Sequence, residues 1–397
     1  MRCVQSLFNL KVNMKKNINL SDPSPLYSQV EKGIQRKIKE GTLKPGECIG
    51  SYSELSKEYS VSTITVRKAV ANLINRGIVF TRAGKGMYVA EPGKERLDLS
   101  KHKSIGLVLQ DLGHPYFSLV VQGIEERAYE LGYNVLISNS SNKIEKEESQ
   151  IEHFRNIGVD GMVIASLSLQ YKATDQIRKL HEEGFPYVMV SYIHDPEYWY
   201  AGTNQELGGY LAAQHLIKTG YKTIGYLHAG RDNLLSEIRK NGYYRALTEF
   251  EIPYDSKFVF YLDEGNPTAI SDRYALGYSF GKRWKSTEHK PAALFVYSDL
   301  VALGLEKALI EEGVSVPDDV AIVGFDDIVM ASYANIPLTT IRQPAQKIGR
   351  ISVDVIQKRL DGTDVGNRSI LNPTLVVRES CGASKKNPTL VKQTLGD

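Results

Sequence analysis

The sequence predicts an α/β protein in which a small winged helix-turn-helix domain is followed by a two-lobed α/β body. Three observations favour this fold class: helical patterns that end in a basic hairpin near the N-terminus, a polar stretch without apolar periodicity, and a long alternation of apolar strands and amphipathic helices. The chain has 397 residues, of which 42% are hydrophobic and 24% charged, enough to bury more than one core. We therefore expect two or three folding units.

The composition favours a cytoplasmic protein without a membrane partner. No stretch approaches the ~20 consecutive apolar residues of a membrane span, and the N-terminus lacks the apolar core of a signal peptide. Cys3, Cys48 and Cys381 are too scattered for a disulfide framework, so we expect free thiols in a reducing compartment. Residues 1–24 are expected to form a disordered extension, with Met14 as an alternative start.

The formal net charge of +3 is unevenly distributed. Residues 25–90 contain eleven Lys and Arg against five Glu, a net charge of +6, and the first 24 residues add +3. The remaining 307 residues therefore carry −6. Because Lys and Arg dominate nucleic-acid affinity by neutralising phosphates, the basic segment is the part expected to meet a polyanion, with a merely solvated basic surface as the alternative.

Residues 25–90 contain the elements of the predicted winged domain. A helical pattern over 26–41 ends at Gly41, and a short helical pattern covers 53–60. After a turn comes a third helical pattern over 61–77, and two β-prone runs over 78–90 then surround a Gly-rich turn. Two helices joined by a tight turn and followed by a basic hairpin indicate a winged helix-turn-helix.

The helix expected over 61–77 has one apolar face, which packs on a core because its apolar residues recur at three- and four-residue steps. Its remaining surface carries Thr63, Thr65, Arg67 and Lys68. Such side chains bond phosphates and base edges, but they also occur on ordinary solvated helices. The position of the helix, before a basic hairpin in the positive segment of the chain, favours DNA recognition.

Residues 91–103 are polar and predict a linker, and residues 104–381 predict the α/β body. Near-continuous apolar strands with helical crossovers indicate parallel sheets covered on both faces. Two open lobes suit the strand number better than one sheet, although periodicity alone leaves a closed barrel open. The tail, 382–397, is polar and is expected to be disordered. The predicted strands are 105–110, 133–138, 159–166, 186–191, 222–228, 257–262, 292–298 and 320–326.

Ligands of open α/β sheets bind beyond the carboxyl ends of the strands. Function is therefore expected in the residues that follow each predicted strand. We expect Asp299, which opens a helix, to serve mainly as a helix cap. The other strand ends are residues 111–117, Ala165, Ser191, residues 228–231, Ser298, Asp326 and Asp327.

The segments PLYSQVEKGIQRKIKEGTLKPGE, VSTITVRKAVANLINRGIV and GKGMYVA resemble the DNA-binding domain of the GntR family, which binds operators as a dimer. The resemblance implies that Arg67 holds a phosphate, that Thr63 and Thr65 approach bases, and that Lys85 in the wing meets the DNA backbone or minor groove. The family usually has Pro-Ser-Glu at residues 50–52 and Arg at position 63, so its operator sequence does not transfer. The implied DNA-binding residues are Ser51, Ser62, Thr63, Thr65, Arg67, Lys68, Lys85 and Gly86.

The body, residues 104–381, resembles the effector domain of the LacI family, which is similar to periplasmic sugar-binding proteins of type I. The resemblance favours two lobes with a cleft over a barrel, and it implies that this body also forms the dimer. It places lobe 1 at about 104–201 and 345–372, and lobe 2 at about 203–342 and 373–381. Matching signatures are HPYF at 114–117, SEIRKNGY at 236–243, YSDLVALG at 297–304, VPDDVAIVGFDD at 316–327, PLTTIRQP at 337–344 and LVVRES at 375–380. The combination of the two domains is that of arabinose-repressor-like regulators.

A sugar site needs flat rings that stack on C–H faces and polar groups that bond neighbouring hydroxyls. Tyr116 and Phe117 supply rings, and by resemblance Arg239, Asp326 and Gln343 supply donors and acceptors in the effector cleft. The alternative for Arg239 is a surface ion pair, and the alternative for Asp326 is a role as a helix N-cap. The family often has Asn, Asp and Asn where this chain has His114, Ser191 and Ser298. These three residues are therefore also candidate effector-binding residues.

Enzyme signatures do not occur: there is no GxGxxG after a strand, no GxxxxGK[ST], no GxSxG and no HExxH. The eight His residues lack metal-ligand spacing, so we expect neither catalysis, nor a metal, nor a cofactor. The interpretation is a homodimeric, DNA-binding transcription regulator, a repressor of carbohydrate-utilisation genes that responds to a small sugar or related metabolite. A sugar-binding transport component, or a sugar-modifying enzyme with an appended DNA-binding head, is the alternative.

Overall fold

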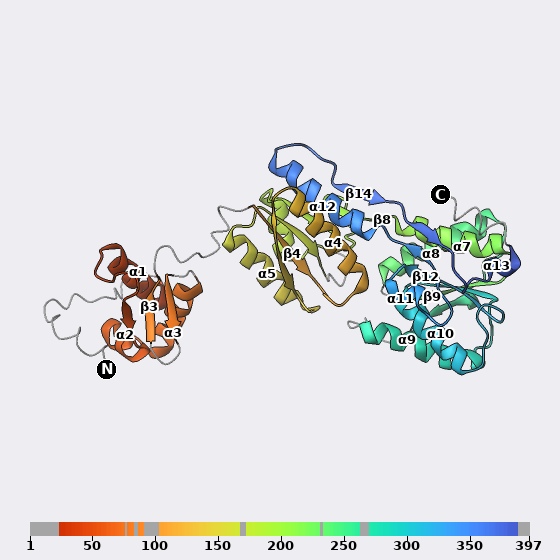
Figure 1. Cartoon of the computed structure of the whole chain (residues 1–397), viewed down its shortest axis with the longest axis horizontal. Coiled ribbons are helices and arrows are strands. Elements are labelled where there is room, and N and C mark those ends of the chain that lie inside the picture. The colour runs from red at the N-terminus through yellow and green to blue at the C-terminus, as the bar shows by residue number, and fades with distance from the viewer. Residues whose placement is uncertain are drawn as a thin grey trace. The chain divides into compact units, whose positions relative to one another are not determined.

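The computed structural model describes residues 24–75, 78–82, 86–90, 103–166, 172–230, 233–262 and 270–387. The chain divides into two compact units, Met1–Asp98 and Leu99–Asp397, shown in Figure 1. Nearly all of the predicted N-terminal extension and of the predicted linker lies outside the described residues. No described helix is both long enough and apolar enough to cross a membrane.

The N-terminal unit is a winged helix, as the sequence predicts. Its helices pack on a core that includes Val30, Leu55 and Val70. The β2–β3 hairpin is antiparallel and is joined by β1, a strand that the sequence analysis missed, in the order β1-β3-β2. The elements are α1 (Leu26–Lys39), β1 (Cys48–Gly50), α2 (Tyr52–Tyr59), α3 (Thr63–Asn75), β2 (Val79–Arg82) and β3 (Gly86–Val89).

The tight turn between α2 and α3 follows from local chemistry. Ser51 and Glu54 form a reciprocal capping box at the start of α2. At its other end Ser60 adopts the left-handed conformation, with φ of 53°, and this ends the helix. The chain then turns within two residues before α3 begins, which is the spacing of a helix-turn-helix.

The C-terminal unit contains two open six-stranded sheets, which excludes the closed barrel. The first, in the order β14-β8-β7-β6-β4-β5, is parallel throughout. Its strands are β4 (Ser104–Leu109), β5 (Asn134–Asn139), β6 (Gly161–Ala165), β7 (Tyr187–Met189), β8 (Tyr200–Thr203) and β14 (Arg368–Leu371). Side chains alternate between two cores on its opposite faces, one shared with α4 (Pro115–Glu130) and α12 (Ala345–Leu360), the other with α5 (Ile144–Ile157) and α6 (Asp175–Glu182).

The second sheet has the order β10-β9-β11-β12-β13-β15 and is parallel except for its β13–β15 edge. Its strands are β9 (Ile224–His228), β10 (Val259–Tyr261), β11 (Ala293–Val296), β12 (Ala321–Asp326), β13 (Thr339–Arg342) and β15 (Thr374–Val376). The helices of this lobe are α7 (Gln205–Thr219), α8 (Leu234–Glu249), α9 (Ile270–Lys282), α10 (Asp299–Glu311), α11 (Val329–Ser332) and α13 (Ala383–Lys386), with 3₁₀ turns at Ser256–Phe258 and Trp284–Ser286. The chain passes between the sheets three times, after β8, after β13 and between β14 and β15.

The start of the C-terminal tail differs from the expected disorder. Residues 383–386 form α13, whose first side chain, Ala383, is fully buried. Lys386 lies over the ring of Tyr221, 3.9 Å from its centroid. These contacts anchor the first turn of a segment whose polar composition alone predicts no structure.

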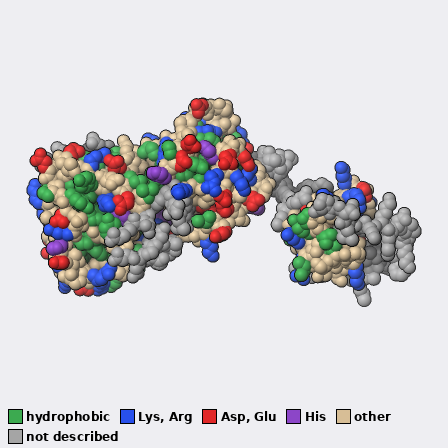
Figure 2. Space-filling view, turned by 180° about the vertical axis from the view of Figure 1, so that it is seen from behind, with side chains coloured by type: hydrophobic (Ala, Val, Ile, Leu, Met, Phe, Trp, Pro, Cys, Tyr) green, Lys and Arg blue, Asp and Glu red, His purple; other side chains and the backbone are tan. Residues whose placement is uncertain are grey.

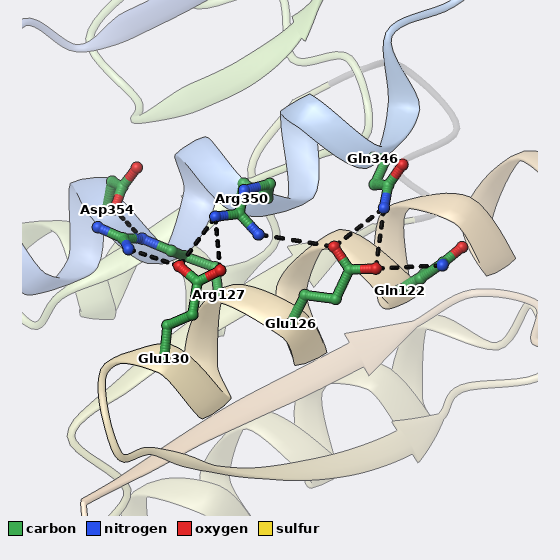
Figure 3. A network of polar contacts seen from close by, with 7 residues as sticks. All are labelled: Gln122, Glu126, Arg127, Glu130, Gln346, Arg350 and Asp354. Atoms are coloured by element: carbon green, nitrogen blue, oxygen red, sulfur yellow. Dashed lines mark hydrogen bonds and ion pairs between the residues drawn. The ribbon is translucent and has the colours of Figure 1, made fainter.

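Helices α4 and α12 approach each other closely, although they are far apart in the sequence. A Cβ atom on Gly123 would lie 1.9 Å from the carbonyl oxygen of Gln346, and one on Gly349 would lie 2.1 Å from that of Val120. Side chains reinforce this seam with alternating charges (Figure 3). Arg350 pairs with Glu130 at 2.8 Å, and the Nε atom of Arg127 donates to Asp354 at 2.6 Å.

We expect Gly123→Ala to lower the free energy of unfolding by ~1–3 kcal/mol. Alanine favours a helix interior over glycine by ~1 kcal/mol, but here its methyl group would meet backbone that cannot rotate away. Urea denaturation of the full chain measures the change. Gly366→Ala is the control, because a Cβ there meets no atom within 4 Å, and equal stability of both variants would contradict the close packing.

Glu306 on α10 is a buried carboxyl group, 2% exposed, that accepts a hydrogen bond from the Ile336 N–H at 3.1 Å. Burial raises its pKa from 4.5 to about 7, although the hydrogen bond opposes the shift. Between these two values the folded state holds a proton that the unfolded state has lost. The stability contributed by this group is therefore greatest at low pH and falls as the pH rises through this window.

We expect Glu306→Gln to remove this pH dependence, because Gln keeps the acceptor and carries no charge. The Tm of the variant minus that of the wild type should therefore be larger at pH 8 than at pH 5. The change corresponds to ~1–3 kcal/mol in the free energy of unfolding. Thermal unfolding at the two pH values measures it. A Tm difference that stays constant between them would show that Glu306 titrates as an ordinary carboxyl group.

Candidate functional site

All eight predicted effector residues line one pocket of the C-terminal unit. His114, Tyr116 and Phe117 lie at the start of α4, and Ser191 follows β7. Ser298, Asp326 and Gln343 lie at the carboxyl ends of β11, β12 and β13, and Arg239 comes from α8. The pocket is therefore built at the carboxyl ends of strands from both sheets, where an open α/β fold places its ligands. Ten further residues line it: Gln110, Ser166, Val190, Tyr192, Tyr200, Gln205, Asn233, Leu235, Arg273 and Tyr297.

An aromatic cluster forms one wall of the pocket. The rings of Tyr116 and Phe117 meet edge to face, with centroids 5.2 Å apart. Phe117 also meets His114, with centroids 5.6 Å apart. Pro115 begins α4 and the Nδ1 atom of His114 accepts from the Tyr116 N–H, so the helix start fixes this cluster.

Arg239 is held rigidly in the pocket. Its side chain is buried, with 6% exposed, and the guanidinium carbon lies 3.6 Å from the centroid of the Phe325 ring. Its Nε atom donates to Gln205 at 2.8 Å, and Nη1 donates to the carbonyl of Tyr297. No described carboxylate pairs with it, so the alternative of a surface ion pair is wrong.

A chain of hydrogen bonds joins Arg239 to the other polar residues. Gln205, which accepts from Arg239, donates through Nε2 to Gln343 at 3.2 Å. Gln343 in turn donates to Asp326 at 2.7 Å. All four side chains are at most 8% exposed, so their polar atoms face one another and the pocket rather than bulk water.

Asp299 does not cap α10 as expected. The N-cap residue is Ser298, and the Asp299 carboxylate instead accepts from the Thr340 hydroxyl at 2.6 Å and from the Ile328 N–H at 3.0 Å. It is fully buried beside Asp326. Burial and then the Asp326 charge raise the pKa of Asp299, because two adjacent buried carboxylates resist joint ionisation.

Two hydroxyl groups of the pocket are buried without a hydrogen-bond partner among the described residues. They are the Oγ atoms of Ser191 and Ser298, both predicted effector residues. Buried polar atoms in proteins are nearly always paired, so these hydroxyls mark positions where a ligand atom would complete a bond.

Most of the predicted DNA-binding residues lie at the start of α3. Ser51 lies at the start of α2, Gly86 lies at the start of β3 in the wing, and Lys85 lies outside the described residues. Thr63, Arg67 and Lys68 are exposed, and Gly86 opens β3 with φ of 109°. Ser51 and Ser62 use their hydroxyls locally. Ser51 caps α2, and the Oγ atom of Ser62 accepts from the Thr65 N–H and pairs with its hydroxyl.

The surface of the N-terminal unit is basic where Figure 2 shows it. Most charged side chains visible there are Lys and Arg, whereas acidic and basic side chains intermingle on the visible face of the C-terminal unit. The guanidinium of Arg67 lies 5.3 Å from the centroid of the Tyr52 ring, which steadies it at the surface. Sequence reasoning missed Ile64, a large apolar side chain on α3 that is 78% exposed.

Sequence reasoning also missed Gln205 and Arg273 in the pocket. Gln205 opens α7 directly after β8, a strand of sequence YAGT too weak in apolar character to predict. Arg273 lies on α9, near the helix start and remote from any strand end. Neither residue lies in a segment that resembles a family signature, so only the fold places them in the pocket.

Comparisons with known proteins agree with both units. Residues 26–89 match the model described as bacterial regulatory proteins, gntR family, and residues 213–381 match the periplasmic binding protein-like domain. The arabinose metabolism transcriptional repressor of Halalkalibacterium halodurans is 29% identical over 92% of this chain and 99% of its own. The HTH-type transcriptional repressor PurR of Mannheimia succiniciproducens is 31% identical over 72% of this chain and 83% of its own.

The chain belongs to the bacterial transcriptional repressors with a helix-turn-helix domain and a periplasmic-binding-protein-like body. Solved structures extend the likeness. The regulator CcpA of Lactococcus lactis has a TM-score of 0.61 at 27% identity, covering 70% of this chain and 99% of its own. The regulator CelR in complex with cellobiose has a TM-score of 0.61 at 26% identity, covering 81% of this chain and 91% of its own.

Among the described residues of this regulator, no group of three or more His, Cys, Asp or Glu side chains is arranged to hold a metal ion. Its pocket instead offers aromatic rings, a buried guanidinium, amides and hydroxyls. This chemistry suits reversible binding of a polar organic molecule.

Proposed function

We propose that this regulator is a cytoplasmic, homodimeric repressor of carbohydrate-utilisation genes. A small sugar or sugar derivative would bind in its pocket and control its affinity for operator DNA. The observation that carries the proposal is the buried chain of Arg239, Gln205, Gln343 and Asp326 beside the aromatic wall of Tyr116 and Phe117. A guanidinium, amides and a carboxylate beside flat rings supply both halves of carbohydrate recognition.

The names of relatives support the choice of effector class. Two relatives are repressors of arabinose metabolism, and one related regulator structure holds ribose and another cellobiose. Because the pocket draws residues from both sheets, a bound ligand would favour one arrangement of the lobes over others. Such a shift would change how the DNA-binding domains of a dimer are presented to the two halves of an operator.

The proposed DNA contacts are made by α3 and the wing. Arg67, Lys68 and Lys85 would bind phosphates, and Thr63 and Thr65 would approach bases in the major groove, with Ser51, Ser62 and Gly86 near the backbone. The exposed Ile64 between the two threonines suits contact with an apolar base edge such as a thymine methyl group.

Binding of the full-length protein to DNA from its own locus tests the proposal. We expect preference for a fragment upstream of its own or neighbouring genes over a coding fragment of equal length and base composition. Affinity should fall at least ~10-fold between about 50 and 200 mM salt, because several phosphate contacts release counterions. Equal retention of both fragments at all salt concentrations would contradict it.

A further inference from the structure

Among the described residues, the pocket is lined by more cationic than anionic side chains. Two guanidinium groups, those of Arg239 and Arg273, line it, against one carboxylate, that of Asp326. No carboxylate of the described residues lies within 4.0 Å of either guanidinium. Burial raises the pKa of Asp326, and the charge of Arg239 opposes this shift. Arg239 is engaged by neutral acceptors, and Arg273 has no anionic partner among the described residues.

The only hydrogen-bond partner of Arg273 among the described residues is His114, whose Nε2 atom lies 3.2 Å from Nη1. Arg273 comes from α9 in the second lobe and His114 from the start of α4 in the first, so this contact bridges the lobes. Burial, followed by the charges of Arg273 and Arg239, lowers the pKa of His114 to about 3. The imidazole is therefore neutral and cannot balance the charge of Arg273.

His114 is also an inadequate acceptor, because its Nδ1 atom lies 3.3 Å from the Tyr116 N–H. Both neighbours of the ring are therefore donors, and a neutral imidazole carries a proton on one of its two nitrogens. It can accept only one of the two contacts. A ligand with a negatively charged acceptor would relieve this conflict by taking over Arg273 and freeing the His114 ring.

The unpaired hydroxyl groups of the pocket also favour a ligand that carries a charged acceptor oxygen. Ser191 on the first lobe and Ser298 on the second are buried in this pocket without a partner among the described residues, and each can donate to an oxygen of a ligand. The bonds to a charged oxygen would be the stronger ones. In the part of the chain that the structure describes, two guanidinium groups and two unpaired hydroxyls therefore line the same pocket as one carboxylate.

We infer that the effector is a sugar derivative with a carboxylate or phosphate group, and that this anionic group pairs with Arg273. The inference rests on the proposed function and specifies its ligand. Arg273 and the serine hydroxyls would hold the anion, while Arg239, Gln343 and Asp326 would bond the sugar hydroxyls beside the aromatic wall. A neutral sugar would leave Arg273 bound to a neutral histidine.

A matched panel tests the inference on the full-length protein at fixed ionic strength. Its neutral members are D-glucose, D-galactose and L-arabinose. Its acids are D-glucuronate, D-galacturonate and L-arabinonate, and its phosphates are glucose 6-phosphate and arabinose 5-phosphate. Thermal shift finds the binders and titration calorimetry gives the affinities. We expect an anionic member to bind at least ~10-fold more tightly than its neutral counterpart, and the arm it belongs to identifies carboxylate or phosphate.

Arg273→Gln should weaken binding of that anionic member by at least ~10-fold while changing neutral sugars less than ~3-fold, and Arg273→Lys should recover part of the affinity. Arg245→Gln on α8 is the control, because it removes an equal charge from an exposed ion pair with Glu206. Tighter binding of a neutral member, or no anionic member that distinguishes wild type from Arg273→Gln, would overturn the inference. If the inference fails but the protein still prefers DNA from its own locus, the proposed function is retained. If that preference is absent as well, the proposed function is contradicted.

Discussion

Arg239→Ala is expected to abolish stabilisation by the effector while leaving binding of operator DNA intact. The guanidinium donates to Gln205 and Tyr297 and covers Phe325, so its removal disconnects the chain that leads through Gln343 to Asp326. We expect the guanidinium to make at least two hydrogen bonds to the effector, each worth ~1.5–3 kcal/mol, so its removal predicts an effector affinity at least ~100-fold weaker. The Tm shift caused by the effector, and the affinity for operator DNA, measure the two effects separately.

Two further variants control this result. Arg245→Ala lies on the same helix but pairs with Glu206 at the surface, and it should behave as the wild type. Arg239→Lys keeps the charge but lacks the planar fork, so it should restore little of the response. A folded Arg239→Ala protein that still responds to the effector would remove Arg239 from the site, and one that no longer binds DNA would give it a different role.

The second large effect is expected at the proposed DNA-binding face of α3. Arg67→Ala should weaken operator binding by ~1–3 kcal/mol per site, and it should lower the slope of log affinity against log salt by about one for each phosphate that is no longer neutralised. The exposed Arg67 side chain is supported only by the Tyr52 ring among the described residues, so its removal should leave the fold unchanged. Fluorescence anisotropy with the own-locus fragment at several salt concentrations measures both quantities.

Lys32→Ala is the matched control for Arg67→Ala. Lys32 is an exposed cation on α1 of the same unit, so its removal changes the net charge equally. If the two variants weakened DNA binding alike, the effect would be one of overall charge, and α3 would no longer be assigned as the recognition helix.

The sequence was sufficient to predict the winged helix and the two lobes because their elements have strong local patterns. The helix over 61–77 has regular apolar spacing, and the eight predicted strands are short segments rich in apolar residues. These segments coincide closely with β4–β7 and β9–β12. Strands β8, β13, β14 and β15 were missed because most of them are rich in small or polar residues and none lies within a long apolar run. Such strands are stable only beside a neighbouring strand, which local sequence does not reveal.

The candidate pocket shows the same division. Residues at strand ends or in family signatures, such as Asp326 and Arg239, could be predicted. Gln205 and Arg273 could not, because nothing in their local sequence places them near the pocket. Their positions depend on how α7 and α9 pack, which close contacts at glycines determine. A Cβ on Gly209 of α7 would lie 2.0 Å from the carbonyl oxygen of Arg239, and one on Gly277 of α9 would lie 2.0 Å from that of Val301.

If the pocket controls the affinity of the winged helix for operator DNA, binding of ligand and binding of DNA must be thermodynamically linked. The most direct test measures the affinity of the full-length protein for its own-locus DNA with and without a saturating ligand that raises its Tm, and the affinity for that ligand with and without the DNA. The ligand is expected to change DNA affinity by ~5–150-fold, and the DNA is expected to change ligand affinity by the same factor. DNA affinity that is identical with and without saturating ligand would contradict it.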